Sequence, residues 1–253
     1  MRRCIILGDS ISEGIGSKKL NYLEDLSDFT NGQYEFINFA KTGTTIEYAE
    51  KRLDEILHLK PDIAIIMYGS VDAQIRANID GTRFGINKFI PKRYKIGGML
   101  EPRAFNSKKP IRKLLNALDN GVRFVLKKTV LFTQGTVQWV DIDTFDARYR
   151  KVIESLNSNN IKLLLVSTIY LDDNYFLNSS MEYEKFNEKI KAISKEYGAI
   201  YLDLYTRLKK SVQDYGWDEY YSHDHFHPNR EGYRFYAECL SKALGDIQMR
   251  EVS

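Results

Sequence analysis

Five short apolar runs recur along the chain, and segments with helical spacing separate them. The runs expected to form buried strands span residues 4–7, 35–39, 63–67, 162–167 and 199–204. The expected helices span residues 48–59, 145–155, 183–197 and 230–244. Since strands that alternate with helices form parallel β-α-β units, we predict an open α/β sheet covered by helices on both faces.

Length and composition predict a single domain over residues 1–253. The chain has 253 residues, of which 43% are hydrophobic and 28% charged, as in ordinary globular proteins. The apolar run after Arg3 is too short for an export signal or a membrane span, so we expect a cytoplasmic protein. Cys4 and Cys239 lie in an expected strand and helix, where buried free thiols suit a reducing compartment.

Positive charge is concentrated in residues 73–140, which carry fourteen Lys or Arg and three Asp or Glu. This segment therefore has an excess of eleven positive charges, while the whole chain has a net charge of only +3. We interpret it as a basic insertion after the third strand, partly helical, that lies over the strand ends as a lid. Nearby aromatic residues are Phe84, Phe89, Tyr94, Phe105 and Trp139.

The charge of this insertion suggests a polyanionic partner. Candidates are an acidic polysaccharide, a nucleotide or phosphate-linked glycan, and an anionic membrane face that would bind the protein peripherally. No nucleic-acid recognition motif accompanies the charge, so nucleic acid is not expected. The alternative is a solvated face without a partner.

Three residues have the chemistry of a serine nucleophile and its activating pair. Ser10 follows the first strand in a Gly-Asp-Ser turn, and Asp224 precedes His227 by three residues. Acyl transfer by serine needs a histidine to accept the hydroxyl proton and a carboxylate to hold the imidazole. We expect Asp224 to bind the Nδ1 atom of His227, so that Nε2 faces Ser10, and Asp9 to brace the turn.

These residues resemble the SGNH, or GDSL-like, hydrolase superfamily in four blocks along nearly the whole chain. The resemblance implies that Ser10 is the nucleophile, that the Ser10 and Gly43 amides bind the oxyanion, and that Asp224 and His227 complete the triad. Gly43 stands in the block at residues 38–45, and Pro228-Asn229 and Gly232-Tyr233 follow His227 as is common in the family. The implied fold is a three-layer α/β/α sandwich of flavodoxin type with a parallel five-stranded sheet.

The third block departs from the family pattern. Where the family has Gly-x-Asn-Asp, with the Asn side chain as a third oxyanion donor, this chain has Gly69-Ser70-Val71-Asp72. Loss of one such donor costs about 10²- to 10³-fold in rate. Ser70, Gln74 or a lid residue would have to replace it, unless the reaction is a transfer to a tightly held acceptor. Asp72, Gln74 and Arg76 are the expected substrate-binding residues.

We therefore expect a serine esterase that removes a small acyl group, acetyl in our interpretation, from a carbohydrate or polysaccharide, without a cofactor. The first alternative is an O-acyltransferase in polysaccharide assembly. The second is a catalytically silent glycan-binding protein that retains the fold. His223, His225 and His227 would share one face of an extended chain, which leaves a metal site as a weaker alternative.

Overall fold

A parallel five-stranded sheet forms the centre of the computed structural model, which describes residues 1–15, 22–95, 100, 109–177 and 179–252. The strand order is β2-β1-β3-β6-β7, which confirms the predicted α/β fold of flavodoxin type. The strands are β1 (Arg2–Gly8), β2 (Tyr34–Asn38), β3 (Ile63–Met67), β6 (Lys162–Val166) and β7 (Ile200–Leu202). Strand order reverses between β1 and β3, where Gly8 pairs with Met67 at the carboxyl edge. Ligand sites of such sheets lie at this edge.

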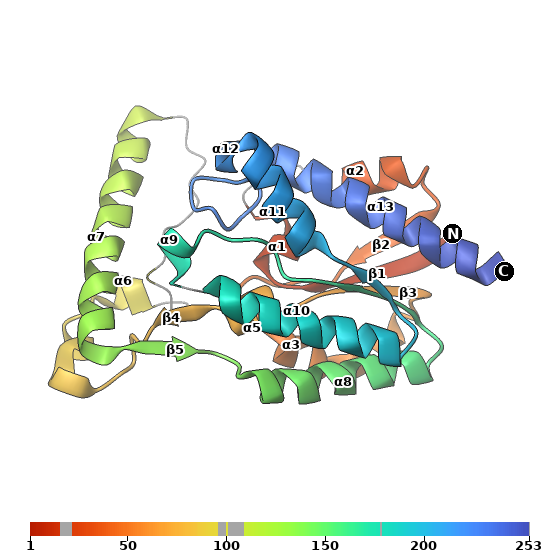
Figure 1. Cartoon of the computed structure of the whole chain (residues 1–253), viewed down its shortest axis with the longest axis horizontal. Helices are drawn as coiled ribbons and strands as arrows, with labels where there is room; N and C mark the ends of the chain where they lie inside the picture. Colours follow the sequence, from red (N-terminus) through yellow and green to blue (C-terminus); the bar gives the residue numbers. More distant parts are fainter. Residues whose placement is uncertain (16–21, 96–99, 101–108, 178, 253) are drawn as a thin grey trace.

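Helices cover both faces of the sheet, as Figure 1 shows. On one face lie α2 (Tyr22–Phe29) and α13 (Arg230–Val252), which pack against each other. On the other face lie α3 (Ile46–Glu50), α4 (Leu53–His58), α8 (Ile142–Ser158) and α10 (Ser179–Glu196). Because both faces are covered, the central strand β3 is a continuous apolar run and is buried along its whole length.

Shorter helices follow the strands at the carboxyl edge or connect to the last helix. They are α1 (Ser10–Glu13), α5 (Ser70–Ala73), α9 (Asp173–Phe176), α11 (Leu204–Tyr215) and α12 (Trp217–Tyr220). The prediction of one continuous helix over residues 48–59 is wrong, because a turn at Lys51 and Arg52 divides this segment into α3 and α4. At that turn the Arg52 amide donates to the Ala49 carbonyl, three residues back, so the regular helix ends.

The basic segment between α5 and α8 folds around a small hairpin. Its elements are β4 (Ile75–Ala77), η1 (Arg83–Lys88), α6 (Lys92–Lys95), α7 (Pro110–Gln134) and β5 (Thr136–Gln138). The strands β4 and β5 pair antiparallel and join the two ends of the segment. A second small core packs α7 against the rest of it, with Ile79, Tyr94 and Val130 buried. Phe105 and the side chain of Phe84 lie outside the described residues.

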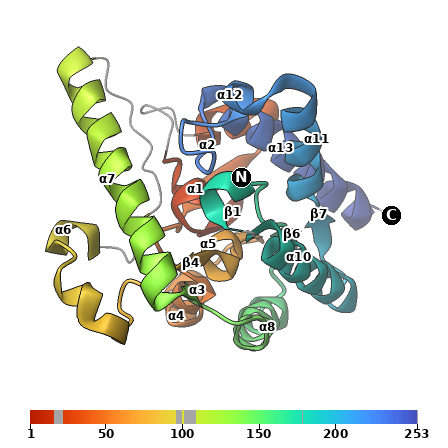
Figure 2. The same ribbon diagram turned by 60° about the vertical axis from the view of Figure 1, so that its left-hand side comes forward.

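Helix α7 stands across the end of the molecule that carries α1 and α9 (Figures 1 and 2). Pro110 begins it at a position where the missing amide hydrogen costs nothing, and Gly135, with φ of 77°, ends it. Strand β5 follows α7 directly after Gly135.

Both cysteines are free and buried, as predicted. Burial raises the pKa of the Cys4 thiol far above its usual range, and also that of Cys239. Thiols of raised pKa are poor nucleophiles, so we assign both residues to the core. Among the described residues, no helix is both long and apolar enough to cross a bilayer.

Candidate active site

Ser10 lies at the first residue of α1, directly beyond the carboxyl end of β1. Asp9 caps this helix, since its Oδ1 atom accepts a hydrogen bond of 2.9 Å from the Ile11 amide. Gly8 is required before it, because a Cβ atom at this position would lie 2.1 Å from Ser12 Oγ. The sequence thus turns sharply from strand to helix and presents the Ser10 hydroxyl at the carboxyl edge.

The three predicted catalytic side chains meet in one hydrogen-bonded chain. The Oγ atom of Ser10 lies 3.0 Å from Nε2 of His227. The other ring nitrogen, Nδ1, lies 2.7 Å from Oδ2 of Asp224. Asp224 is 1% exposed and Ser10 is 5% exposed, so little water competes for these bonds. This geometry lets His227 accept the Ser10 proton while Asp224 holds the imidazole.

The loop that carries His227 is held by backbone and side-chain hydrogen bonds. Oδ1 of Asp224 accepts from the amides of Phe226 and His227, at 3.1 and 3.0 Å. Asn229 donates through Nδ2 to the carbonyls of Asp218, Glu219 and Tyr221. Both oxygens of Asp224 are therefore occupied, and the imidazole is fixed before any substrate binds.

The loop at residues 38–45 binds directly to the turn of Ser10. Asn38 donates to the Ser12 carbonyl at 3.0 Å, and the Lys41 amide donates to the Gly8 carbonyl at 3.1 Å. Gly43 follows with a φ of 72°, a left-handed conformation that favours glycine. Within the described part of the chain, the structure records no acceptor for the Gly43 amide. This amide is thus available to a ligand beside Ser10.

The third block packs against the first two through Asp72. Its Oδ1 atom accepts from the Ile46 amide at 2.9 Å, and its Oδ2 atom accepts from the Gly69 amide at 3.1 Å. Asp72 is fully buried. The expectation that Asp72 binds substrate is therefore not supported by its position, because both carboxylate oxygens face the backbone and brace the site from within.

Ser70, Gln74 and Arg76 also lie inside the protein. Ser70 Oγ accepts from the Ile169 amide at 3.2 Å, which ties the third block to the loop after β6. Arg76 donates through Nε to Oε1 of Gln74 at 2.8 Å, and its guanidinium carbon lies 3.4 Å from the centre of the Trp139 ring. The Nε2 atom of Gln74 is buried and has no hydrogen-bond partner among the described residues. Of the suggested replacements for the missing Asn, Gln74 has a spare donor, and the Ser70 hydroxyl also keeps its own hydrogen because it only accepts from Ile169.

Two buried carboxyl groups behind Ser10 have raised pKa values. Burial raises the pKa of Asp9 to about 6, and the Ile11 amide and His227 oppose that rise. Burial also raises the pKa of Asp72 to about 7. The hydrogen bond from the Ile46 amide lowers this pKa, and the nearby carboxylate of Asp9 raises it further. The Val71 amide is among the groups that act on Asp9, which places the Val71 backbone beside the Ser10 turn.

An open cavity of about 480 Å³ begins at Gly43 and extends over α3 to the start of α8. Its lining includes the rings of Tyr48 and Trp139 and the cations Lys51 and Arg148. Arg148 pairs with Glu47 at 3.2 Å. The cavity therefore offers aromatic faces and hydrogen-bonding groups next to the available amide.

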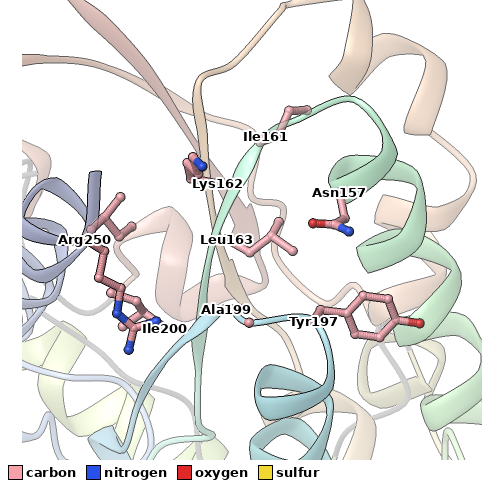
Figure 3. Close-up of a pocket in the computed structure, with 10 residues that line it drawn as sticks. Asn157, Ile161, Lys162, Leu163, Tyr197, Ala199, Ile200 and Arg250 are labelled. Atoms are coloured by element: carbon pink, nitrogen blue, oxygen red, sulfur yellow. The ribbon is translucent and has the colours of Figure 1, made fainter. Parts of the chain in front are cut away.

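A separate cavity of about 220 Å³ lies at the opposite edge of the sheet (Figure 3). Lys162 and Ile200, the first residues of β6 and β7, line it together with Tyr197 and Arg250. The amino ends of the strands face this cavity and the carboxyl ends face Ser10. It is therefore remote from the candidate active site.

A second Asp-His pair joins the loop of His227 to Asp172 at the start of α9, and the sequence did not predict it. Nδ1 of His225 lies 2.8 Å from Oδ2 of Asp172, and the imidazole stacks on Trp217 with ring centres 4.9 Å apart. His225 has a φ of 50°, so the chain is not extended there, as the metal alternative would require. Among the described residues, no three His, Cys, Asp or Glu side chains form a group that could hold a metal ion.

Comparison with known proteins agrees with this geometry. Residues 6–235 match the model of the GDSL-like lipase/acylhydrolase family. A lipase/acylhydrolase from Enterococcus faecalis is 18% identical, with a TM-score of 0.60 over 96% of this chain and 94% of that one. A catalytic mutant of an acetylxylan esterase from Geobacillus stearothermophilus is 14% identical, with a TM-score of 0.63 over 96% and 94% of the two chains. No curated protein matches the sequence significantly.

Proposed function

Because this chain belongs to the GDSL-like lipase/acylhydrolase family, we propose that it is a serine esterase that removes a small acyl group, acetyl in the first instance, from a carbohydrate. The observation that carries the proposal is the bonded chain of Ser10, His227 and Asp224, with distances of 3.0 and 2.7 Å. Nucleophile, base and orienting acid are the groups that ester cleavage by serine needs.

In the proposed mechanism, Ser10 Oγ attacks the acyl carbon as Nε2 of His227 takes its proton. The amides of Ser10 and Gly43 donate to the oxyanion of the tetrahedral intermediate. His227 then returns the proton to the leaving sugar oxygen, and the acyl group stays on Ser10. A water molecule, deprotonated by His227, attacks this acyl-enzyme and releases the carboxylic acid and the free serine.

The cavity beside Gly43 supports a carbohydrate as the alcohol part of the ester. Trp139 and Tyr48 present aromatic rings, and Thr44, Thr45 and Thr144 bring hydroxyl groups to its lining. Carbohydrates bind to such surfaces through stacking on the rings and hydrogen bonds at their hydroxyls. One of the similar folds belongs to an acetylxylan esterase, which accords with this substrate class.

Val71 favours a second candidate, an O-acyltransferase. Its side chain is 3% exposed, stands where the family has Asn and cannot donate a hydrogen bond. With one donor fewer, hydrolysis slows, whereas an acceptor held in the cavity would gain rate from its positioning. A silent glycan-binding protein with this fold would show neither reaction.

The test measures release of the acyl group from p-nitrophenyl acetate, butyrate and octanoate, and of acetate from acetylated oligosaccharides. We expect the native protein to cleave the acetyl ester faster than the butyryl and octanoyl esters. The Ser10→Ala variant should release acetate no faster than buffer alone. Addition of an unacetylated oligosaccharide separates the two enzymes, because a transferase moves acetyl to it with little free acetate. Equal rates for the native protein and Ser10→Ala would contradict both enzymes and favour the binding protein.

We keep a cytoplasmic location as part of the proposal. It is supported by the two free, buried cysteines, which suit a reducing compartment. Fractionation of cells that produce the full chain, with antibody detection, tests this point. Recovery from the culture medium would contradict it.

A further inference from the structure

The outer face of helix α7 is apolar along most of its length. The exposed residues Ile111, Leu114, Leu115, Leu118, Val122, Val125 and Phe132 have exposed fractions between 43% and 92%. With about 100° of rotation per residue, all seven lie within an arc of about 100°. Thr129 and Thr133 share this arc, and within this described helix it holds no charged side chain.

The inner face of α7 buries two cations, Arg123 and Lys127, beside the apolar Val130. Lys127 donates from Nζ to the Tyr175 carbonyl of α9, and its ammonium lies 5.8 Å from the centre of the Phe176 ring. Arg123 is 2% exposed and donates to Asp119 at 2.9 Å. The Arg123–Asp119 bond lies within α7, so the helix is attached to its surroundings by Lys127 and by the core contacts of Val130. The apolar face is thereby left toward solvent.

The charge around this face is positive. Helix α7 contains Arg112, Lys113, Arg123, Lys127 and Lys128, and its one acid, Asp119, is already bound to Arg123. Arg112, Lys113 and Lys128 are exposed, as are Lys88, Lys92 and the apolar Phe89 of the same insertion. An apolar helix face beside exposed cations is complementary to anionic headgroups above acyl chains.

We propose that α7 lies in the plane of an anionic lipid surface, with its apolar face in the boundary between headgroups and acyl chains. The helix stands at the end of the molecule that carries α1, so the bound protein would turn the edge with Ser10 toward the lipid (Figures 1 and 2). This proposal does not depend on the proposed function, because the contact uses no catalytic residue.

A second copy of the chain is the competing occupant. The spacing of Ile111, Leu115, Leu118, Val122 and Val125 alternates between four and three residues, as in paired helices. Paired helices normally carry acidic and basic residues on both sides of such an apolar stripe. Here Asp119 is the one acid, so two insertions with eleven excess positive charges each would repel. The charge therefore favours the lipid surface.

Flotation with vesicles tests the proposal on the full chain. We expect the protein to float with phosphatidylcholine vesicles that contain phosphatidylglycerol, to remain below with phosphatidylcholine alone, and to dissociate as salt rises. Leu118→Glu should reduce the bound fraction about tenfold or more, since it places a charge in the apolar face. The matched control is Met181→Glu on α10, also at an exposed residue, which should bind like the native chain. Ser10→Ala should bind equally well, which separates this result from the enzymatic one.

Three outcomes would overturn the proposal. The first is equal binding to vesicles with and without phosphatidylglycerol, or no binding to either. The second is binding that Leu118→Glu leaves unchanged while its melting temperature equals that of the native chain. The third is a dimer in sedimentation analysis that Leu118→Glu converts to a monomer, which would assign the face to a second copy.

Discussion

Nε2 of His227 lies 3.0 Å from Oγ of Ser10, although 217 residues separate them in the chain. The contact exists because β1 ends two residues before Ser10, between β2 and β3, while the loop before α13 returns to the same edge of the sheet. Asp224 completes it from the same loop, with its carboxylate 2.7 Å from the imidazole. Side chains from the two ends of the chain thus form one hydrogen-bonded unit.

Asp224→Asn should lower kcat for p-nitrophenyl acetate by about 10⁴-fold. The carbonyl oxygen of the new amide side chain would still accept from the loop amides. Its NH₂ group cannot accept from Nδ1 of His227, so the imidazole would take the wrong tautomer. Steady-state kinetics measure the loss, and thermal unfolding shows whether the fold is kept. A variant that unfolds near the native temperature and retains native kcat would contradict the role of Asp224.

Val71→Asn should raise kcat for hydrolysis by at least about tenfold, because it restores the donor whose loss costs about 10²- to 10³-fold. The Val71 backbone lies beside the Ser10 turn and the family has its Asn donor at this position, so we expect the new amide to reach the oxyanion. Val71→Leu is the matched control, since it changes volume without adding a donor. Equal rates for the Asn and Leu variants would show that hydrolysis does not lack this hydrogen bond.

Trp139→Ala should reduce kcat/KM for an acetylated oligosaccharide about fivefold more than for p-nitrophenyl acetate, since stacking on an aromatic ring contributes about 1 kcal/mol. Trp139→Phe keeps a ring in the cavity and should preserve most of the selectivity. Lys209→Ala, on another part of the surface, controls for a general loss of activity. If both substrates lose the same factor in Trp139→Ala, the cavity beside Gly43 does not hold the sugar.

The stability of the Asp9→Asn variant relative to the native chain should increase as pH rises. The pKa of Asp9 is about 6 in the folded protein, above its ordinary value of 3.8. The folded state therefore holds this proton more tightly, and its stabilising contribution is complete below about pH 4 and disappears as pH rises through about 6. Between about pH 4 and a pH above 6, the unfolding free energy of Asp9→Asn should rise relative to that of the native chain by up to about 3 kcal/mol. Urea unfolding at a series of pH values measures it, and a shift in the opposite direction would mean that the carboxylate is stabilised by its surroundings.

Gly8→Ala and Gly245→Ala form a pair that tests the strand-to-helix turn. A Cβ atom at Gly8 would lie 2.1 Å from Ser12 Oγ, so this change should destabilise the protein by about 1–3 kcal/mol and displace Ser10. At Gly245, within α13, a Cβ atom meets no atom within 4 Å, and Ala should stabilise by about 0.5–1 kcal/mol. Chemical unfolding distinguishes the two, and native stability in Gly8→Ala would show that the turn is less constrained than its packing indicates.

The features that the sequence predicted correctly are those that local residue patterns determine. The apolar run at residues 63–67 is β3 to the residue, and Ser10, His227 and Asp224 meet as expected. The break between α3 and α4 was missed because helical spacing continues across Lys51 and Arg52. Strands β4 and β5 were missed because they pair over a distance of about sixty residues, which short-range spacing cannot reveal.

The roles of buried polar residues were also beyond the sequence. Asp72 was expected to bind substrate, but it accepts hydrogen bonds from two backbone amides that only the folded chain brings together. The pair of His225 and Asp172 joins segments 53 residues apart and has no motif. The spacing of α7 shows an apolar face, but only the fold shows that this face is exposed and that the side with Arg123, Lys127 and Val130 is buried.

The most direct test of the account is covalent labelling of the intact protein with a fluorophosphonate, followed by mass spectrometry. We predict addition of one phosphonyl group at Ser10, and no addition in Ser10→Ala or His227→Ala. Labelling at another residue, or no labelling of the native chain above the two variants, would contradict the claim that Ser10 is a nucleophile activated by His227.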